Sequence, residues 1–145
     1  MPANIQITKV FWAYAEQDLK KIRTPVFIEE QQVEPNFEWD ELDDAAVHLL
    51  ALIDNQAVGC LRIIDYQKIG RMAVLKPWRG LGVGRTLLTQ AIDICRQHSS
   101  QHIYLSAQTH AVGFYIAAGF KVTSQEYTDV NIPHVNMQFT INNKS

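Results

Sequence analysis

The sequence predicts a single α/β domain, residues 1–145, in which a mixed β-sheet carries helices on its faces. From position 47 onward, strand-like and helix-like segments follow one another in the order β-β-β-α-β-α-β-β, an alternation typical of a sheet covered by helices. The length of 145 residues fits one domain rather than two. A composition of 47% hydrophobic and 19% charged residues is that of a globular protein with a substantial core.

The N-terminal third predicts one strand, two short helices and a loop. Ile5 and Ile7 suggest the strand, and residues 16–22 suggest a helix that Thr24–Pro25 ends or kinks, because the residue before proline avoids the α conformation. Residues 26–33 predict a second short helix with Pro25 near its first turn. Residues 34–44 are acidic and contain a proline, which predicts a loop.

The remaining elements are predicted from apolar runs and the turn residues between them. Asp54–Asn55–Gln56 separates two apolar runs and predicts a hairpin. The long helix has apolar residues on one face and polar residues on the other. The predicted strands are 47–53, 57–64, 69–75, 102–107, 121–127 and 135–141, and the predicted helices are 82–98 and 111–118, the latter ended by Gly119.

The bulk charge and the cysteines exclude several classes of function. Thirteen basic and 15 acidic residues leave a net charge of −2, so we expect no nucleic acid or membrane partner. Residues 1–11 do not read as a signal peptide, and no apolar run approaches the roughly 20 residues that span a bilayer, so we expect a cytoplasmic protein. Cys60 and Cys95 have no metal-ligand spacing and are predicted to be buried thiols, with no metal site.

The segment from Met72 to Arg85 carries the clearest functional signal. A predicted buried strand leads into a turn with alternating glycines, and a long helix begins directly afterwards. Glycine permits positive φ and close approach of a ligand to the backbone. The free N–H groups and the dipole at a helix start favour a phosphate, and Arg79 and Arg85 would add charge at the rim. The segment therefore predicts an anion cradle.

Two familiar phosphate-binding motifs do not fit this cradle. A dinucleotide-binding fingerprint would need glycine where Arg85 stands and an acidic residue about 20 positions on, where Gln101 and His102 lie. A P-loop would need glycine at position 79 and lysine at position 85, and both are arginine.

A third pattern fits. Arg79-x-x-Gly82-x-Gly84, after a strand, resembles the pyrophosphate-binding signature of the GNAT acyltransferase superfamily. Downstream, Gln108-x-x-Ala111-x-x-Phe114-Tyr115-x-x-x-Gly119-Phe120 resembles the family's next block, a helix followed by a strand. Three further patches resemble a subfamily of small bacterial GNAT proteins: Arg23-x-x-Val26-Phe27-x-x-Glu30-Gln31-x-Val33, Glu38-x-Asp40-x-x-Asp43 and Ile132-Pro133-His134-x-x-Met137.

The resemblance implies a GNAT fold, with a mostly antiparallel sheet of about six or seven strands flanked by about four helices. It implies acetyl-CoA as co-substrate and direct attack by an amine in a ternary complex. By resemblance, the backbone of Met72, Ala73 and Val74 pairs with the pantetheine arm and supplies oxyanion donors. Gln108 stands where the family usually has asparagine and could hydrogen-bond pantetheine. The residues implied for the pyrophosphate are Arg79, Gly80, Leu81, Gly82, Val83, Gly84 and Arg85.

Three residues are candidates for catalysis. Tyr115 matches the family's general-acid position, although an ordinary packing tyrosine on an amphipathic helix is the alternative. The family has no universal base; Glu30 and His134 are candidates because they lie in subfamily-like patches, while a solvated glutamate and a structural histidine are the alternatives. The acidic loop with Trp39 could meet a cationic amine or simply be solvated; its acids are Glu38, Asp40 and Asp43.

Two functions remain open from sequence. The first is acetyl transfer to a small-molecule or peptide amine, and the second is a non-catalytic acyl-CoA sensor or partner-binding module on the same fold. The acceptor cannot be inferred, and a homodimer is possible.

Overall fold

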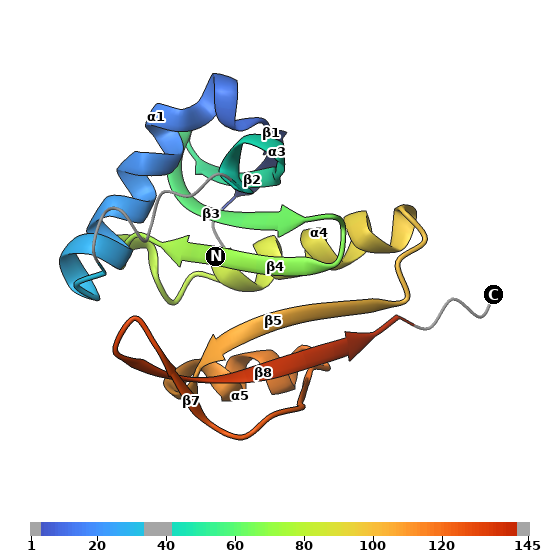
Figure 1. The fold of residues 1–145 in the computed structure, drawn as a ribbon. Coiled ribbons are helices and arrows are strands. Elements are labelled where there is room, and N and C mark those ends of the chain that lie inside the picture. Colours follow the sequence, from blue (N-terminus) through green and yellow to red (C-terminus); the bar gives the residue numbers. More distant parts are fainter. Residues whose placement is uncertain (1–3, 34–41, 142–145) are drawn as a thin grey trace.

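The computed structural model describes residues 4–33 and 42–141 and shows an α/β domain built on one sheet (Figure 1). The strands lie in the order β1-β2-β3-β4-β5-β8-β6, and β7 pairs with β8. Only the β4–β5 pair is parallel within the described residues. The strands are β1 (Ile5–Val10), β2 (Val47–Ile53), β3 (Gln56–Ile64), β4 (Lys68–Val74), β5 (His102–Gln108), β6 (Lys121–Val122), β7 (Tyr127–Asp129) and β8 (Ile132–Thr140).

Helices cover both faces of this sheet, as the alternation of elements predicts. The helices are α1 (Trp12–Arg23), η1 (Thr24–Glu30), α3 (Leu42–Ala45), η2 (Lys76–Trp78), α4 (Val83–Gln97), η3 (Thr109–Ala111) and α5 (Val112–Ala117). The predicted fold class, a mostly antiparallel sheet with about four α-helices, is confirmed; the sheet has eight strands because the segment predicted as 121–127 forms β6 and β7 separately.

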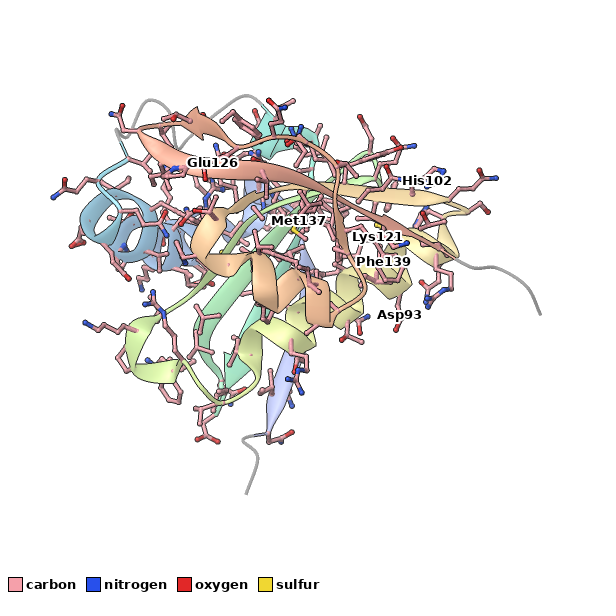
Figure 2. The ribbon with its side chains drawn as sticks, turned by 90° about the horizontal axis from the view of Figure 1, so that it is seen from below. Asp93, His102, Lys121, Glu126, Met137 and Phe139 are labelled. Atoms are coloured by element: carbon pink, nitrogen blue, oxygen red, sulfur yellow. The ribbon has the colours of Figure 1, made fainter. Side chains whose placement is uncertain are left out.

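Two apolar clusters form the core, one on each side of the sheet. The larger cluster joins the buried face of α4 to β1–β5 and β8 and contains the apolar helix positions predicted from sequence: Leu87, Leu88, Ala91, Ile92 and Cys95. The smaller cluster packs α1 against the opposite face, where Cys60 and Ala73 lie. Met137 of β8 belongs to the larger cluster and lies near the centre of the molecule in Figure 2. Trp12 is buried in the smaller cluster.

The first helix differs from its prediction. It begins at Trp12 rather than at residue 16. The α-helix ends at Arg23, as Thr24–Pro25 predicts, and the chain passes directly into η1, a π-helix that ends at Glu30 and has Pro25 in its first turn. Pro25 has no N–H to donate, and the chain accommodates it by widening the turn, with the N–H of Gln31 bonding the carbonyl of Val26 at 3.1 Å. The smaller apolar cluster holds this segment helical because Ile22 and Val26 are both buried there. Figure 1 shows the continuous coil.

Two loops also differ. Part of the segment predicted as loop 34–44 forms the short helix α3, and the rest of it lies outside the described residues. The last strand begins at Ile132 rather than 135, because Val130 and Asn131 take positive φ values of 45° and 65° and close a tight hairpin with β7. The hairpin predicted at Asp54 and Asn55 is present, with φ values of 51° and 64°.

Strands β4 and β5 pair over a short stretch and then separate. Their register joins only Lys68 to Tyr104 and Ile69 to Leu105. Beyond that point β4 is irregular, with Arg71 at a φ of 49°, and its continuation pairs only with β3. Figure 1 shows the two strands spreading apart toward the left. The backbone of Met72–Val74 is therefore not paired with β5.

Candidate active site

A cleft of about 660 Å³ lies where β4 and β5 separate. Its walls come from η1, β3, β4, the start of α4, β5, α5 and the β7–β8 hairpin. Nine residues that the sequence singled out line it: Glu30, Met72, Ala73, Val74, Arg79, Gly84, Gln108, Tyr115 and His134. Gly80, Leu81, Gly82, Val83 and Arg85 do not line it and instead form the adjoining loop and first turn of α4.

The glycine loop leaves the N-terminus of α4 without a side-chain cap. Gly80 and Gly82 have φ values of 82° and 88°, a conformation that side-chain-bearing residues rarely adopt. Gly82 is the N-cap, and the first helical hydrogen bond runs from the N–H of Thr86 to its carbonyl at 3.0 Å. The N–H groups of Val83, Gly84 and Arg85 thus have no acceptor within the helix, which is the arrangement that binds anions.

Arg79 points away from this helix start, toward β4 and η1. Its Nε donates to the carbonyl of Val74 at 2.9 Å, and its two terminal nitrogens donate to the Glu30 carboxylate at 3.0 and 2.8 Å. The hydrogen bond from Arg79, with its charge and that of Lys76, holds the pKa of Glu30 below its usual value despite some burial. Much of the charge expected from Arg79 at the rim is therefore balanced, whereas Arg85 is exposed on the first turn.

Tyr115 is half-buried on α5 between two other rings. Phe114 and Phe120 contact it edge-on, with ring centroids 5.1 and 5.9 Å away. Burial raises the pKa of Tyr115 to about 12. The phenol is thus fully protonated at neutral pH and can donate a hydrogen bond into the cleft.

Gln108 and His134 face each other across β5 and β8. The Gln108 side chain donates to Oε1 of Gln31 at 2.7 Å and accepts from Nε2 of His110 at 2.6 Å. Nδ1 of His134 bonds the carbonyl of Ile132 at 2.7 Å. Because a carbonyl only accepts, Nδ1 carries the proton, and the lone pair of the neutral ring lies on Nε2.

The identity of the chain follows from comparison with known proteins. Residues 12–141, which include the glycine loop and α5, match the family described as "Acetyltransferase (GNAT) domain". This chain belongs to the GNAT acetyltransferase family.

Several known proteins match more than four fifths of the chain. It is 38% identical over 123 residues to the uncharacterized protein YyaT of Bacillus subtilis, covering 81% of this chain and 83% of the relative. It is 35% identical over 136 residues to the uncharacterized N-acetyltransferase YjcF of Bacillus subtilis, covering 89% and 97%. An acyl-CoA N-acyltransferase from Pseudomonas aeruginosa has a TM-score of 0.83 at 32% identity, covering 94% of this chain and all 100% of its own.

A more distant structure contains acetyl coenzyme A. An acetyltransferase from Bacillus anthracis, solved in complex with acetyl coenzyme A, has a TM-score of 0.59 at 21% identity, covering 67% of this chain and 63% of its own. At that identity the likeness concerns the fold alone.

One predicted contact of this GNAT protein is wrong. The sequence predicts Asp43 in an acidic loop that meets a cationic amine or is solvated, but Asp43 is 1% exposed and accepts hydrogen bonds from Arg23 at 2.8 Å and Arg62 at 3.1 Å. Burial alone would raise its pKa, yet the two guanidinium groups outweigh burial and lower it. The Asp43 carboxylate is thus bound to two arginines in the core. Nε2 of His48 also lies 3.0 Å from the backbone carbonyl oxygen of Asp43, at hydrogen-bond distance. Glu38, Trp39 and Asp40 lie outside the described residues.

Sequence reasoning did not assign a role to Gln31 or to Arg62. Gln31 belongs to the patch that resembles the small bacterial subfamily, so the motif pointed to this residue. It could not indicate that Gln108 would be the hydrogen-bond partner of Gln31. In residues 4–33 and 42–141, no group of three or more His, Cys, Asp or Glu side chains could hold a metal. No helix in the same ranges is long and apolar enough to cross a membrane.

Proposed function

We propose that this GNAT protein transfers the acetyl group of acetyl-CoA to a primary amine by direct attack in a ternary complex. The observation that carries the proposal is the opening between β4 and β5 next to an uncapped helix start. When bound, acetyl-CoA supplies an activated thioester carbonyl. The remaining requirements are a binding surface, a group that stabilises the departing thiolate and a base for the amine.

The described residues fit a CoA molecule in two places. The N–H groups at the start of α4, reached through the loop Arg79–Gly82, suit a pyrophosphate. The backbone of Met72–Val74 is not paired with β5 and so, apart from the Val74 carbonyl that accepts from Arg79, is available to a pantetheine arm and to a carbonyl oxygen. The Gln108 side chain already has two partners, so a bond to pantetheine would require exchange of one of them.

Tyr115 is assigned as the hydrogen-bond donor to the thiolate. A thiol has a pKa near 8.5, and the Tyr115 pKa is about 12. Full proton transfer from the phenol would therefore be uphill by about 5 kcal/mol. A hydrogen bond needs no such transfer, and a protonated phenol in a half-buried site makes a strong one.

His134 is assigned as the base in preference to Glu30. The neutral imidazole holds its free lone pair on Nε2, and the residue lines the same cleft as Tyr115. Glu30 uses both carboxylate oxygens on Arg79, and its lowered pKa makes it a weaker base. An imidazole nitrogen with an available lone pair can accept the proton that the attacking amine must lose.

The test is a screen of acetyl-CoA turnover. The wild-type protein is incubated with acetyl-CoA and a panel of small amines and peptides, and both released CoA and acetylated product are measured. With the best acceptor, His134→Gln should lower kcat by about 10²-fold or more. Binding of acetyl-CoA without turnover of any amine would instead support the sensor function, and absence of binding at millimolar ligand would refute both.

A further inference from the structure

Two consecutive residues at the end of η1 reach opposite sides of the cleft. Glu30 receives two hydrogen bonds from Arg79, which follows η2 on the β4 side. Gln31 receives a hydrogen bond from Gln108, the last residue of β5, at 2.7 Å. These partners are separated by 49 and 77 positions in sequence. The end of η1 therefore spans the opening between the strands.

The sheet itself does not set the width of this opening. β4 and β5 share two register pairs in the described residues, at the start of β4 and the middle of β5, and none beyond them toward Val74 and Gln108. Arg79 adds a third bond, from Nε to the carbonyl of Val74, so the Glu30 bridge reaches the last residue of β4 itself. The bridges from Glu30 and Gln31 thus connect the diverging ends of two strands that no longer pair.

We propose that Glu30 and Gln31 are positioning residues that hold the two walls of the cofactor cleft at the spacing acetyl-CoA requires. The inference rests on the proposed function, because it assumes that CoA binds between β4 and β5. Glu30 acts through Arg79 and Val74, and Gln31 acts through Gln108. Neither residue touches the reacting atoms in this scheme, which gives Glu30 a role different from that of a base.

The expected effects are moderate because both bridges are partly exposed. The Arg79 and Glu30 side chains are 39% and 45% exposed, and pairs of this kind contribute little individually. Loss of either bridge should raise the dissociation constant for CoA by about 3- to 10-fold. The effect on kcat at saturating acetyl-CoA should be no more than about 2-fold, whereas loss of a general base lowers kcat by about 10²- to 10⁴-fold.

The experiment measures CoA binding by titration calorimetry in Glu30→Gln and Gln31→Ala, with thermal unfolding to verify folding. Matched controls are the neighbouring exposed residues: Glu29→Gln removes the same charge, and Gln32→Ala truncates the same side chain. Each bridge is also tested in the absence of its partner. Glu30→Gln should have no further effect in an Arg79→Gln background, and Gln31→Ala should have none in a Gln108→Ala background.

The outcomes separate this inference from the proposed function. The positioning role would be supported by three results together. Glu30→Gln and Gln31→Ala bind CoA more weakly, the two control variants bind it normally, and neither substitution has a further effect once Arg79 or Gln108, respectively, is replaced. Wild-type affinity in both variants would overturn it while leaving the proposed function intact. A large fall in kcat with unchanged CoA affinity in Glu30→Gln would also overturn it and make Glu30 the base. Failure of the wild type to bind CoA would refute the proposed function itself.

Discussion

At the scale of single residues, the sharpest chemical role that we propose is that of the Tyr115 phenol. It lines the cleft on α5, and its high pKa keeps the proton in place far above neutral pH. In the proposed role the phenol acts in its protonated form, so its contribution to the rate should persist through neutral and moderately alkaline pH. It should be lost only as pH approaches about 12.

Tyr115→Phe should lower kcat by about 10²-fold and leave the affinity for acetyl-CoA nearly unchanged. The substitution keeps the ring contacts with Phe114 and Phe120 and removes only the hydroxyl. Steady-state kinetics with the best amine from the screen measures this change in kcat. Tyr104→Phe is the control, since Tyr104 is 42% exposed on β5 and does not line the cleft. An unchanged kcat, measured where chemistry limits turnover, would leave Tyr115 as a packing residue only.

Gly82→Ala should weaken CoA binding by 10-fold or more. Its φ of 88° is strained for a residue with a Cβ, so the substitution shifts the loop that presents the first N–H groups of α4. Calorimetry with CoA measures the loss. Gly113→Ala is the control because that glycine lies in α5 at an ordinary φ with open space around it. Normal binding by a folded Gly82→Ala protein would place the pyrophosphate elsewhere.

At the scale of elements, a buried ion cluster holds three segments together. Arg23 ends α1, Asp43 lies in α3 and Arg62 lies in β3, and the Asp43 carboxylate bonds both arginines. Arg23 also lies over the ring of Trp12, with Cζ 5.5 Å from the ring centroid. This cluster fixes α1 on the sheet, and η1 with its two cleft bridges continues directly from α1.

Asp43→Asn should lower the free energy of unfolding by about 3 kcal/mol at pH 7, because two buried arginines would lose their shared counter-charge. The exposed neighbour Asp44→Asn should change it by less than about 0.5 kcal/mol. Urea unfolding of both variants measures this difference. Equal stability of the two variants would mean that the cluster contributes nothing net.

The same cluster predicts a dependence of stability on pH. The folded-state pKa of Asp43 lies below its unfolded value, which is near 3.9. Its contribution is therefore fully present above the unfolded pKa and is lost as pH falls through the folded value. The stability difference between wild type and Asp43→Asn should shrink below about pH 4, and a constant difference down to pH 2 would contradict this assignment.

At the scale of the whole molecule, the divergence of β4 and β5 leaves an opening that a ligand can close. A ligand that contacts both strands and α4 stabilises the folded state by mass action. At a concentration 100 times its dissociation constant, CoA should add about 2.7 kcal/mol, which corresponds to a rise in Tm of about 5–10 °C for a chain of this size. Differential scanning fluorimetry measures this rise in Tm, with NAD and ATP as control ligands. An equal shift with all three ligands would argue against a specific CoA site.

Several parts of this structure follow from local sequence alone. The helix predicted at 82–98 is Val83–Gln97, because its apolar positions recur at helical spacing and its start is marked by Gly82. The Asp54–Asn55 hairpin follows because these residues tolerate positive φ. The glycine loop and the family blocks determined the fold class and the nature of the cofactor proposed here, since short motifs on adjacent elements need no long-range information.

Only the tertiary structure decided what depends on contacts between distant segments. The chain stays helical beyond Pro25, as a π-helix that adjoins α1 directly, because Ile22 and Val26 are both buried in the smaller apolar cluster. Asp43 is a buried counter-ion rather than a loop acid, since its partners are 20 and 19 positions away. The engagement of Glu30 by Arg79 and of Gln108 by Gln31 depends on where η1 crosses two diverging strands. Propensity and periodicity act over a few residues, whereas these pairings require the assembled sheet.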